Sequence, residues 1–134
     1  MKLYFITFIV ASLIFFIIDF IWLSITVKTI YRPILGDMIL DKPILWAAFL
    51  FYVMYIIGLT ILVLIPSINA DSLYKVFGLG FVFGFVAYGT YNLTNMAVLK
   101  NWSPTIVVID MFWGGILTGL TSTVTIFIIK NYFK

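Results

Sequence analysis

Two aspartates, Asp19 and Asp110, stand in the same local pattern, Asp-x-x-Trp, and each is the only charged residue in a long apolar stretch. A carboxylate at a bilayer centre costs roughly 2.5–3.5 kcal/mol on insertion scales, so a chain that keeps two of them usually needs them. Such a group can bind a proton or a cation, act as a general acid or base, or hydrogen-bond a neighbouring helix. Neutral amides would join helices without a charge, which favours a functional role for the two aspartates over a purely structural one.

The composition predicts an integral membrane protein. The 134 residues are 64% hydrophobic and 10% charged, with a mean hydropathy of +1.21, which is far too apolar for a soluble domain. The absence of Cys and His excludes disulfides, thiol chemistry, Cys/His metal sites and His-ligated haem, so we expect no metal and no cofactor. The basic residues are scattered at the ends of the apolar stretches, so the expected partner is the lipid bilayer and not nucleic acid.

Four apolar runs are long enough to cross roughly 30 Å of hydrocarbon at 1.5 Å per residue. They are continuously apolar, which excludes the alternating pattern of a β-barrel. The first run is longer than the apolar part of a signal peptide and has no small-x-small cleavage site, so we interpret it as a retained span. The sequence therefore predicts an all-α integral membrane protein, a single domain over 1–134, with four transmembrane helices in a compact antiparallel bundle. The expected spans are Leu3–Val27, Ile44–Ile65, Leu73–Leu99 and Thr105–Ile129.

The orientation in the membrane is poorly determined by charge. Lysine and arginine are balanced four against four between the two faces: Lys2, Lys75, Lys130 and Lys134 on the face of the termini, and Lys28, Arg32, Lys42 and Lys100 on the other. The free amino terminus and the acidic residues of the first loop favour a multipass protein of the cell (inner) membrane with cytoplasmic termini. The balance also permits insertion both ways round and an antiparallel homo-oligomer.

The helix directions bring polar residues of all four spans to one half of the bundle, near the first and third loops. Asp19 and Asp110 fall at a shared depth, about 9–13 Å from that face at 1.5 Å per residue. We expect both carboxylates to face the interior and to approach the third span at Asn92 or Asn95. The predicted feature is a polar cup that binds a small ligand or a proton, with no catalytic residue assigned. Its candidate residues are Asp19, Trp22, Tyr52, Tyr55, Tyr88, Tyr91, Asn92, Asn95, Asp110 and Trp113.

The other half of the bundle carries packing signals. Gly80 and Gly84 on the third span, and Gly115 and Gly119 on the fourth, have the small-xxx-small spacing that lets helices approach closely. The two remaining tryptophans, Trp46 and Trp102, lie near span ends and are interpreted as interface-belt residues.

Four segments distributed over nearly the whole chain together resemble a family of small bacterial four-span membrane proteins of unknown function. The resemblance implies a fold and a bacterial membrane location but no activity. In that family an aspartate commonly stands at the position of Asn92. This chain therefore lacks the third carboxylate, and only a mechanism that uses Asp19 and Asp110 alone is open to it. The segments are Asp19-x-x-Trp22-Leu23, Ala47-Ala48-x-x-Phe51-Tyr52, Tyr88-Gly-Thr-Tyr-Asn-Leu-Thr-Asn95 and Asp110-x-x-Trp113-Gly114.

Three functions are compatible with these residues. The first, which we favour, is a small-solute binding or transport protein in which Asp19 or Asp110 binds a proton or cation. The second is a membrane-embedded enzyme acting on a lipid or isoprenoid, with the two aspartates as acid and base. The third is a non-catalytic assembly or sensor subunit whose cup binds a partner helix. The first ranks highest because polar groups at depth more often line a path or pocket than a reaction centre.

Overall fold

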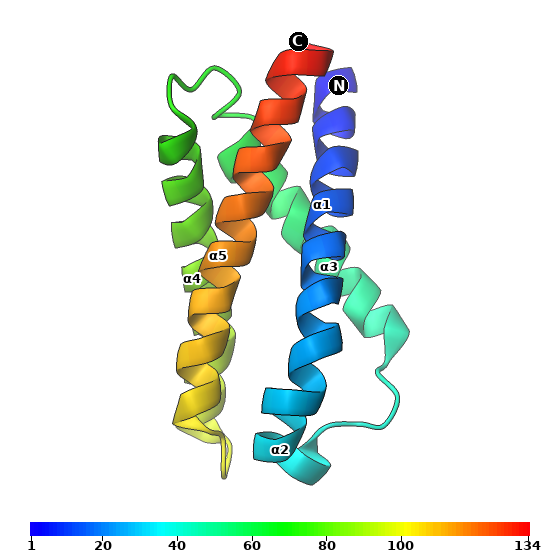
Figure 1. Ribbon diagram of the computed structural model, residues 1–134, viewed down its shortest axis with the longest axis vertical. Helices are drawn as coiled ribbons and strands as arrows, with labels where there is room; N and C mark the ends of the chain where they lie inside the picture. The colour runs from blue at the N-terminus through cyan, green and yellow to red at the C-terminus, as the bar shows by residue number, and fades with distance from the viewer.

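The protein is an up-and-down bundle of four long helices with both termini at the same end (Figure 1). The computed structural model describes residues 1–134, all helical or loop, with no strand. All four long helices, with their continuations, are long and apolar enough to cross a membrane. This confirms the predicted all-α membrane fold. The long helices are α1 (Lys2–Thr26), α3 (Leu45–Leu59), α4 (Leu73–Val98) and α5 (Pro104–Ile128).

The starts of α4 and α5 are set by serine caps. The hydroxyl oxygen of Ser72 accepts a hydrogen bond from the backbone N–H of Tyr74 at 3.2 Å, and that of Ser103 accepts one from Ile106 at 3.4 Å. Pro104 occupies the first helical position of α5, where its missing N–H costs nothing. These caps fix where the third and fourth spans leave the membrane face.

The first span is longer than the sequence predicted. After α1 the chain continues through a wide π-helical turn (Val27–Tyr31), the short helix α2 (Arg32–Leu35) and a final tight turn (Gly36–Met38). The predicted span Leu3–Val27 agrees with α1 to within one residue, but the helical continuation beyond it was not predicted. Pro33 lies in the first turn of α2, where a proline is tolerated, so the chain stays helical beyond the first cationic residues. This continuation carries Tyr31, whose side chain reaches Asp110 on α5.

Helices α4 and α5 form the most closely packed pair, and glycines make the approach possible. A Cβ atom on Gly84 would overlap the backbone carbonyl of Gly114, and one on Gly80 would lie 2.5 Å from the Ser122 hydroxyl. Gly115 and Gly119 lie under phenylalanine rings of α4. The four glycines singled out in the sequence thus all lie at the α4–α5 interface.

Helix α3 crosses the bundle at a steep tilt (Figure 1). It packs against α1, and its continuation Thr60–Leu64 packs against α1, α4 and α5. Fully buried apolar side chains such as Leu59, Leu64 and Ile126 fill the end of the bundle that holds the termini. The first half of α3 stands further from α4, which leaves the opposite end of the bundle less tightly filled.

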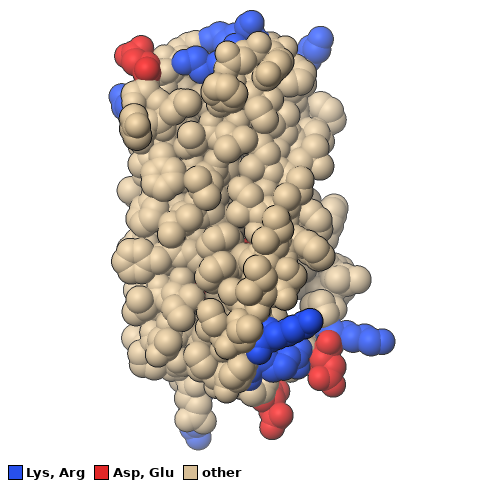
Figure 2. Space-filling model, in the orientation of Figure 1, with Lys and Arg blue, Asp and Glu red and all other residues tan.

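The surface has the charge distribution of a membrane protein. The Lys, Arg, Asp and Glu side chains in view gather at the two ends of the molecule, and the band between them is apolar (Figure 2). Large apolar side chains such as Phe49, Leu62 and Val82 are exposed along this band, as lipid contact requires.

Candidate functional site

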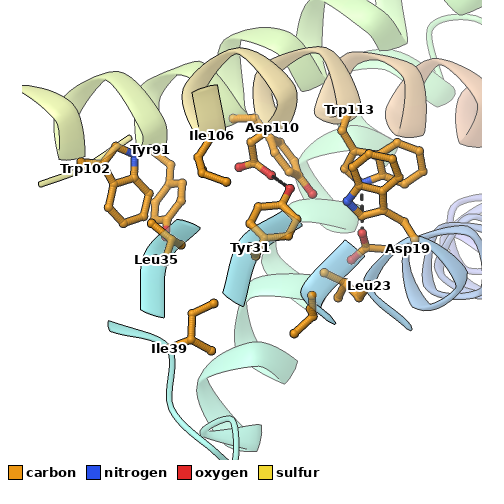
Figure 3. A pocket seen from close by; sticks show the side chains of 13 residues that line it. Asp19, Leu23, Tyr31, Leu35, Ile39, Tyr91, Trp102, Ile106, Asp110 and Trp113 are labelled. Carbon is orange, nitrogen blue, oxygen red and sulfur yellow. Dashed lines mark hydrogen bonds between the residues drawn. The ribbon is translucent and has the colours of Figure 1, made fainter. Parts of the chain in front are cut away.

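A cavity of about 240 Å³ lies between the first span and the α4–α5 pair, in the half of the bundle away from the termini (Figure 3). Both aspartates line it, together with three of the four tryptophans. Its volume corresponds to about eight water molecules at ~30 Å³ each, which suits a small solute. The lining residues are Asp19, Trp22, Leu23, Val27, Tyr31, Leu35, Ile39, Tyr88, Tyr91, Trp102, Ile106, Asp110 and Trp113.

Asp110 is held by one phenol and one amide. The hydroxyl of Tyr31 donates to its Oδ1 at 2.7 Å, and Nδ2 of Asn92 donates to its Oδ2 at 2.6 Å. Asn92 is fully buried and its Nδ2 also donates to the carbonyl of Tyr88, one turn back on α4. Through these two hydrogen bonds, Asp110 on α5 links α4 to the helical segment that follows α1.

Asp19 is held by a phenol and an indole. The hydroxyl of Tyr52 donates to its Oδ2, and Nε1 of Trp113 donates to its Oδ1 at 3.2 Å. The residue is 6% exposed, so these two donors replace nearly all of the water that a carboxylate would otherwise bind. Asp19 on α1 is therefore linked to α3 and α5. The first span and α5 take part in the hydrogen bonds of both carboxylates.

The two Asp-x-x-Trp motifs meet through their tryptophans. The rings of Trp22 and Trp113 are stacked, with centroids 4.1 Å apart and planes 7° from parallel. Such an aromatic pair contributes about 0.5–1.5 kcal/mol beyond its buried area. Because each tryptophan lies three residues after its aspartate, stacking the two rings brings both carboxylates to one cavity.

The electrostatic character of the cavity follows from what faces the carboxylates. All four of their hydrogen-bond donors are neutral groups, and no Lys or Arg lines the cavity. The one ion pair in the structure, between Arg32 and Asp41 at 3.8 Å, is exposed and lies outside the cavity. A carboxylate in a poorly hydrated site without a cationic partner is stabilised by binding either a proton or a cation.

Three further polar atoms at the site have no hydrogen-bond partner. They are the Nε1 donors of Trp22 and Trp102, which line the cavity, and the Oδ1 acceptor of Asn92, and all three are buried. Buried polar groups are paired in the great majority of cases, so each can take a partner from a bound molecule. The cavity walls thus offer a ligand two indole donors besides the two carboxylates.

The remaining predicted site residues divide into two groups. Tyr88 and Tyr91 line the cavity, and Tyr55 lies deeper, with its hydroxyl 2.7 Å from that of Thr118. Asn95 is half-buried, lines no described cavity and makes no side-chain hydrogen bond to either aspartate. The expectation that both aspartates approach the third span was correct for Asp110 and wrong for Asp19, whose partners lie on α3 and α5.

Two aromatic residues of the cavity were missed in the sequence, besides five aliphatic ones. Tyr31 was assigned to a loop because Lys28 follows the apolar run, and Trp102 was interpreted as an interface-belt residue. Trp102 instead lines the cavity and packs edge-on against Tyr91, with ring centroids 5.8 Å apart. Trp46, the other expected belt residue, is 72% exposed at the start of α3. Each is a single aromatic residue close to the end of a predicted span, and that position was the only available signal for Tyr31 and Trp102.

A helical bundle with two carboxylates inside its apolar band defines a small polytopic membrane protein. The family model described as "Predicted membrane protein (DUF2177)" matches residues 4–127, and the chain belongs to this family. This confirms the family resemblance on which the sequence analysis drew. Neither a curated protein nor a solved structure matches the chain.

Proposed function

We propose that this protein binds a small positively charged solute in the cavity between α1 and α5 and carries it across the membrane. The observation that supports the proposal most is that Asp19 and Asp110 line one cavity in which all their donors are neutral. A cation bound there gains charge attraction in a site that holds little water, where attraction is weakened less than in bulk solvent. A proton is the competing occupant, since either would neutralise a carboxylate.

The aromatic walls suit an organic cation better than a bare metal ion. Trp22, Trp113 and Trp102 line the cavity, and indole faces attract ammonium groups by about 0.5–2 kcal/mol each. The structure has no group of three or more carboxylates that could hold a metal ion. Two carboxylates with aromatic rings around them are the usual surroundings of an amine or a quaternary ammonium ion.

Transport is the wider part of the proposal. The cavity reaches the loop end of the bundle through Ile39 and Trp102, while buried side chains such as Leu59 and Ile126 fill the end that holds the termini. A cavity that extends toward only one end of the bundle is compatible with one of the two states that a carrier alternates between. We further propose that the protein lies in the inner membrane of a bacterium with its termini in the cytoplasm.

The proposal is tested by cation binding to the purified protein in nanodiscs of zwitterionic lipid. In a Trp46→Phe variant the three remaining tryptophans all line the cavity, so intrinsic fluorescence reports on its occupancy. We expect tetramethylammonium or methylammonium to change the fluorescence saturably, with stronger binding at neutral than at acidic pH. Neopentyl alcohol, an uncharged molecule close to tetramethylammonium in size and shape, serves as the control and should bind more weakly.

Transport itself is measured in proteoliposomes that accumulate a labelled form of the cation that binds. Uptake that is faster than in protein-free liposomes and that depends on an imposed proton gradient would support proton coupling. Absence of saturable binding by every cation tested, with the protein folded by circular dichroism, would contradict the proposed function as a whole.

A further inference from the structure

A second cavity, of about 480 Å³, lies between α3 and α4 and shares a wall with the first. Three residues, Tyr88, Tyr91 and Asp110, line both cavities. The lining of the second cavity is completed by Phe51, Met54, Tyr55 and Ala87, so Asp110 is its only charged residue. The carboxylate of Asp110 therefore lies between a smaller chamber, which both carboxylates line, and a larger apolar groove.

The groove lies where the bilayer reaches the protein. Phe51, Met54 and Tyr91 are 38%, 66% and 56% exposed on helices that cross the membrane, so their outer surfaces face lipid. The tilt of α3 separates its first half from α4 and leaves this side open. Whatever fills the groove comes from the apolar part of the membrane.

We propose that the groove receives the hydrocarbon chain of a single-chain amphiphile whose cationic head binds at Asp110. This deepens the proposed function, on which it rests, by naming the substrate class: an alkyl amine or alkyl ammonium that enters from the bilayer. The charge of Asp110 complements the head, and the rings of Tyr88 and Tyr91 beside it offer cation–π contacts. The hydrocarbon chain gains little free energy by moving from lipid into the groove, because both surroundings are apolar. The groove instead provides the space that the hydrocarbon chain needs while the cationic head binds the carboxylate.

Depth along the helices agrees with this arrangement. Asp110 lies six positions after Pro104, about 9 Å into the helix at 1.5 Å per residue. On α4, which also lines the groove, Tyr91 and Ala87 lie seven and eleven positions before Val98, about 10 and 16 Å from the same face. The groove thus begins at the depth of the carboxylate and continues toward the centre of the bilayer, which is how an amphiphile lies in one leaflet.

The inference is tested with tetramethylammonium and decyltrimethylammonium in the nanodisc fluorescence assay. Ala87 lines the groove but not the first cavity, so Ala87→Phe should block the chain and spare the head. We expect the affinity for decyltrimethylammonium to fall about tenfold or more, which corresponds to 1.4 kcal/mol, while that for tetramethylammonium changes less than about twofold. Ala87→Leu should give a smaller loss, and Ala97→Phe, on the same helix but lining neither cavity, should give none.

The outcomes separate the inference from the function on which it rests. If Ala87→Phe binds both cations as the parent does, the groove does not hold the chain and the inference is overturned, while the proposed function stands. Equal binding of decanol and decyltrimethylammonium would overturn the requirement for a cationic head. If neither cation binds the parent protein, the proposed function and the inference both fail.

Discussion

The indole of Trp113 donates a hydrogen bond to the carboxylate of Asp19 at 3.2 Å, across 94 positions of the sequence. The same indole stacks on Trp22, and Trp113 lies one helical turn after Asp110. The second Asp-x-x-Trp motif therefore orients the aspartate of the first, and the stacked indoles fasten α1 to α5. Because of this contact, two carboxylates that are far apart in sequence line one cavity.

The stacked indoles have a spectroscopic consequence. Two parallel indoles 4.1 Å apart couple their electronic transitions, so we expect an exciton signal in the circular dichroism of the folded protein. Trp22→Phe and Trp113→Phe should each abolish it, because either change leaves a single indole. Trp102→Phe and Trp46→Phe should retain it and serve as controls. A signal that survives in Trp113→Phe would show that the stack does not form.

The phenols that bind the carboxylates should stabilise the bundle modestly. Tyr31→Phe and Tyr52→Phe each remove one donor to a carboxylate, so we expect each to lower the free energy of unfolding by about 0.6–1.7 kcal/mol. Tyr74→Phe is the control, because its side chain is 90% exposed and should have no effect. Unfolding in mixed micelles with increasing denaturing detergent measures the difference. Losses no larger than that of the control would contradict the assigned hydrogen bonds.

The sequence predicted the membrane class and four spans, because twenty-residue apolar runs have few alternatives. Their boundaries were accurate where a capping serine and a proline mark them, as at Pro104. The helical continuation after Val27, which runs for a further eleven residues to Met38, was not predicted. Lys28 and Arg32 were taken as the end of the span, although long cationic side chains can extend to water from a continuing helix.

The sequence predicted how deep in the bundle the two aspartates lie, but not which side chains bind them. Counting residues from each span end places Asp19 and Asp110 in the same half of the bundle, and both line one cavity. Which donor faces which carboxylate depends on the rotation of each helix about its axis. That rotation is set by packing, such as the contact of Gly84 with the α5 backbone, and spacing along one helix does not reveal it. The choice of Tyr52 and not Asn95 as a partner was therefore not readable from the sequence.

A matched pair of glycine substitutions tests the α4–α5 interface. A Cβ on Gly84 would overlap the Gly114 carbonyl, so Gly84→Ala should lower the free energy of unfolding by about 1–3 kcal/mol. Gly78 lies on the same helix with nothing within 4 Å of an added Cβ. Gly78→Ala should raise the free energy of unfolding by about 0.5–1 kcal/mol, because alanine favours the helix. Equal effects at the two positions would contradict the close approach of the helices.

Reporter fusions test the topology. Four spans place both termini on one side, and we expect a cytoplasm-active fluorescent protein fused after Lys134 to be bright and a periplasm-active phosphatase to be inactive. Comparable activity of both reporters would indicate insertion both ways round, which the balanced lysine and arginine count permits. Strong phosphatase activity without fluorescence would reverse the proposed orientation.

The central claim, that Asp19 and Asp110 bind a cation through their charge, is tested most directly by their asparagine variants. Asparagine keeps the size of the side chain and an interhelical hydrogen bond but removes the charge. We expect Asp19→Asn and Asp110→Asn to extract and fold normally, and to bind tetramethylammonium at least about tenfold more weakly, because loss of one partner of a buried charge pair costs about 2–5 kcal/mol. The parent should bind more strongly as the pH rises through the range in which the carboxyls ionise, and the variants should lose part of that dependence. Asp71→Asn, an exposed carboxylate at the other end of the molecule, is the control and should match the parent. If both variants bind tetramethylammonium as tightly as the parent, with the same pH dependence, the aspartates serve only to hold the helices together and the proposed function is wrong.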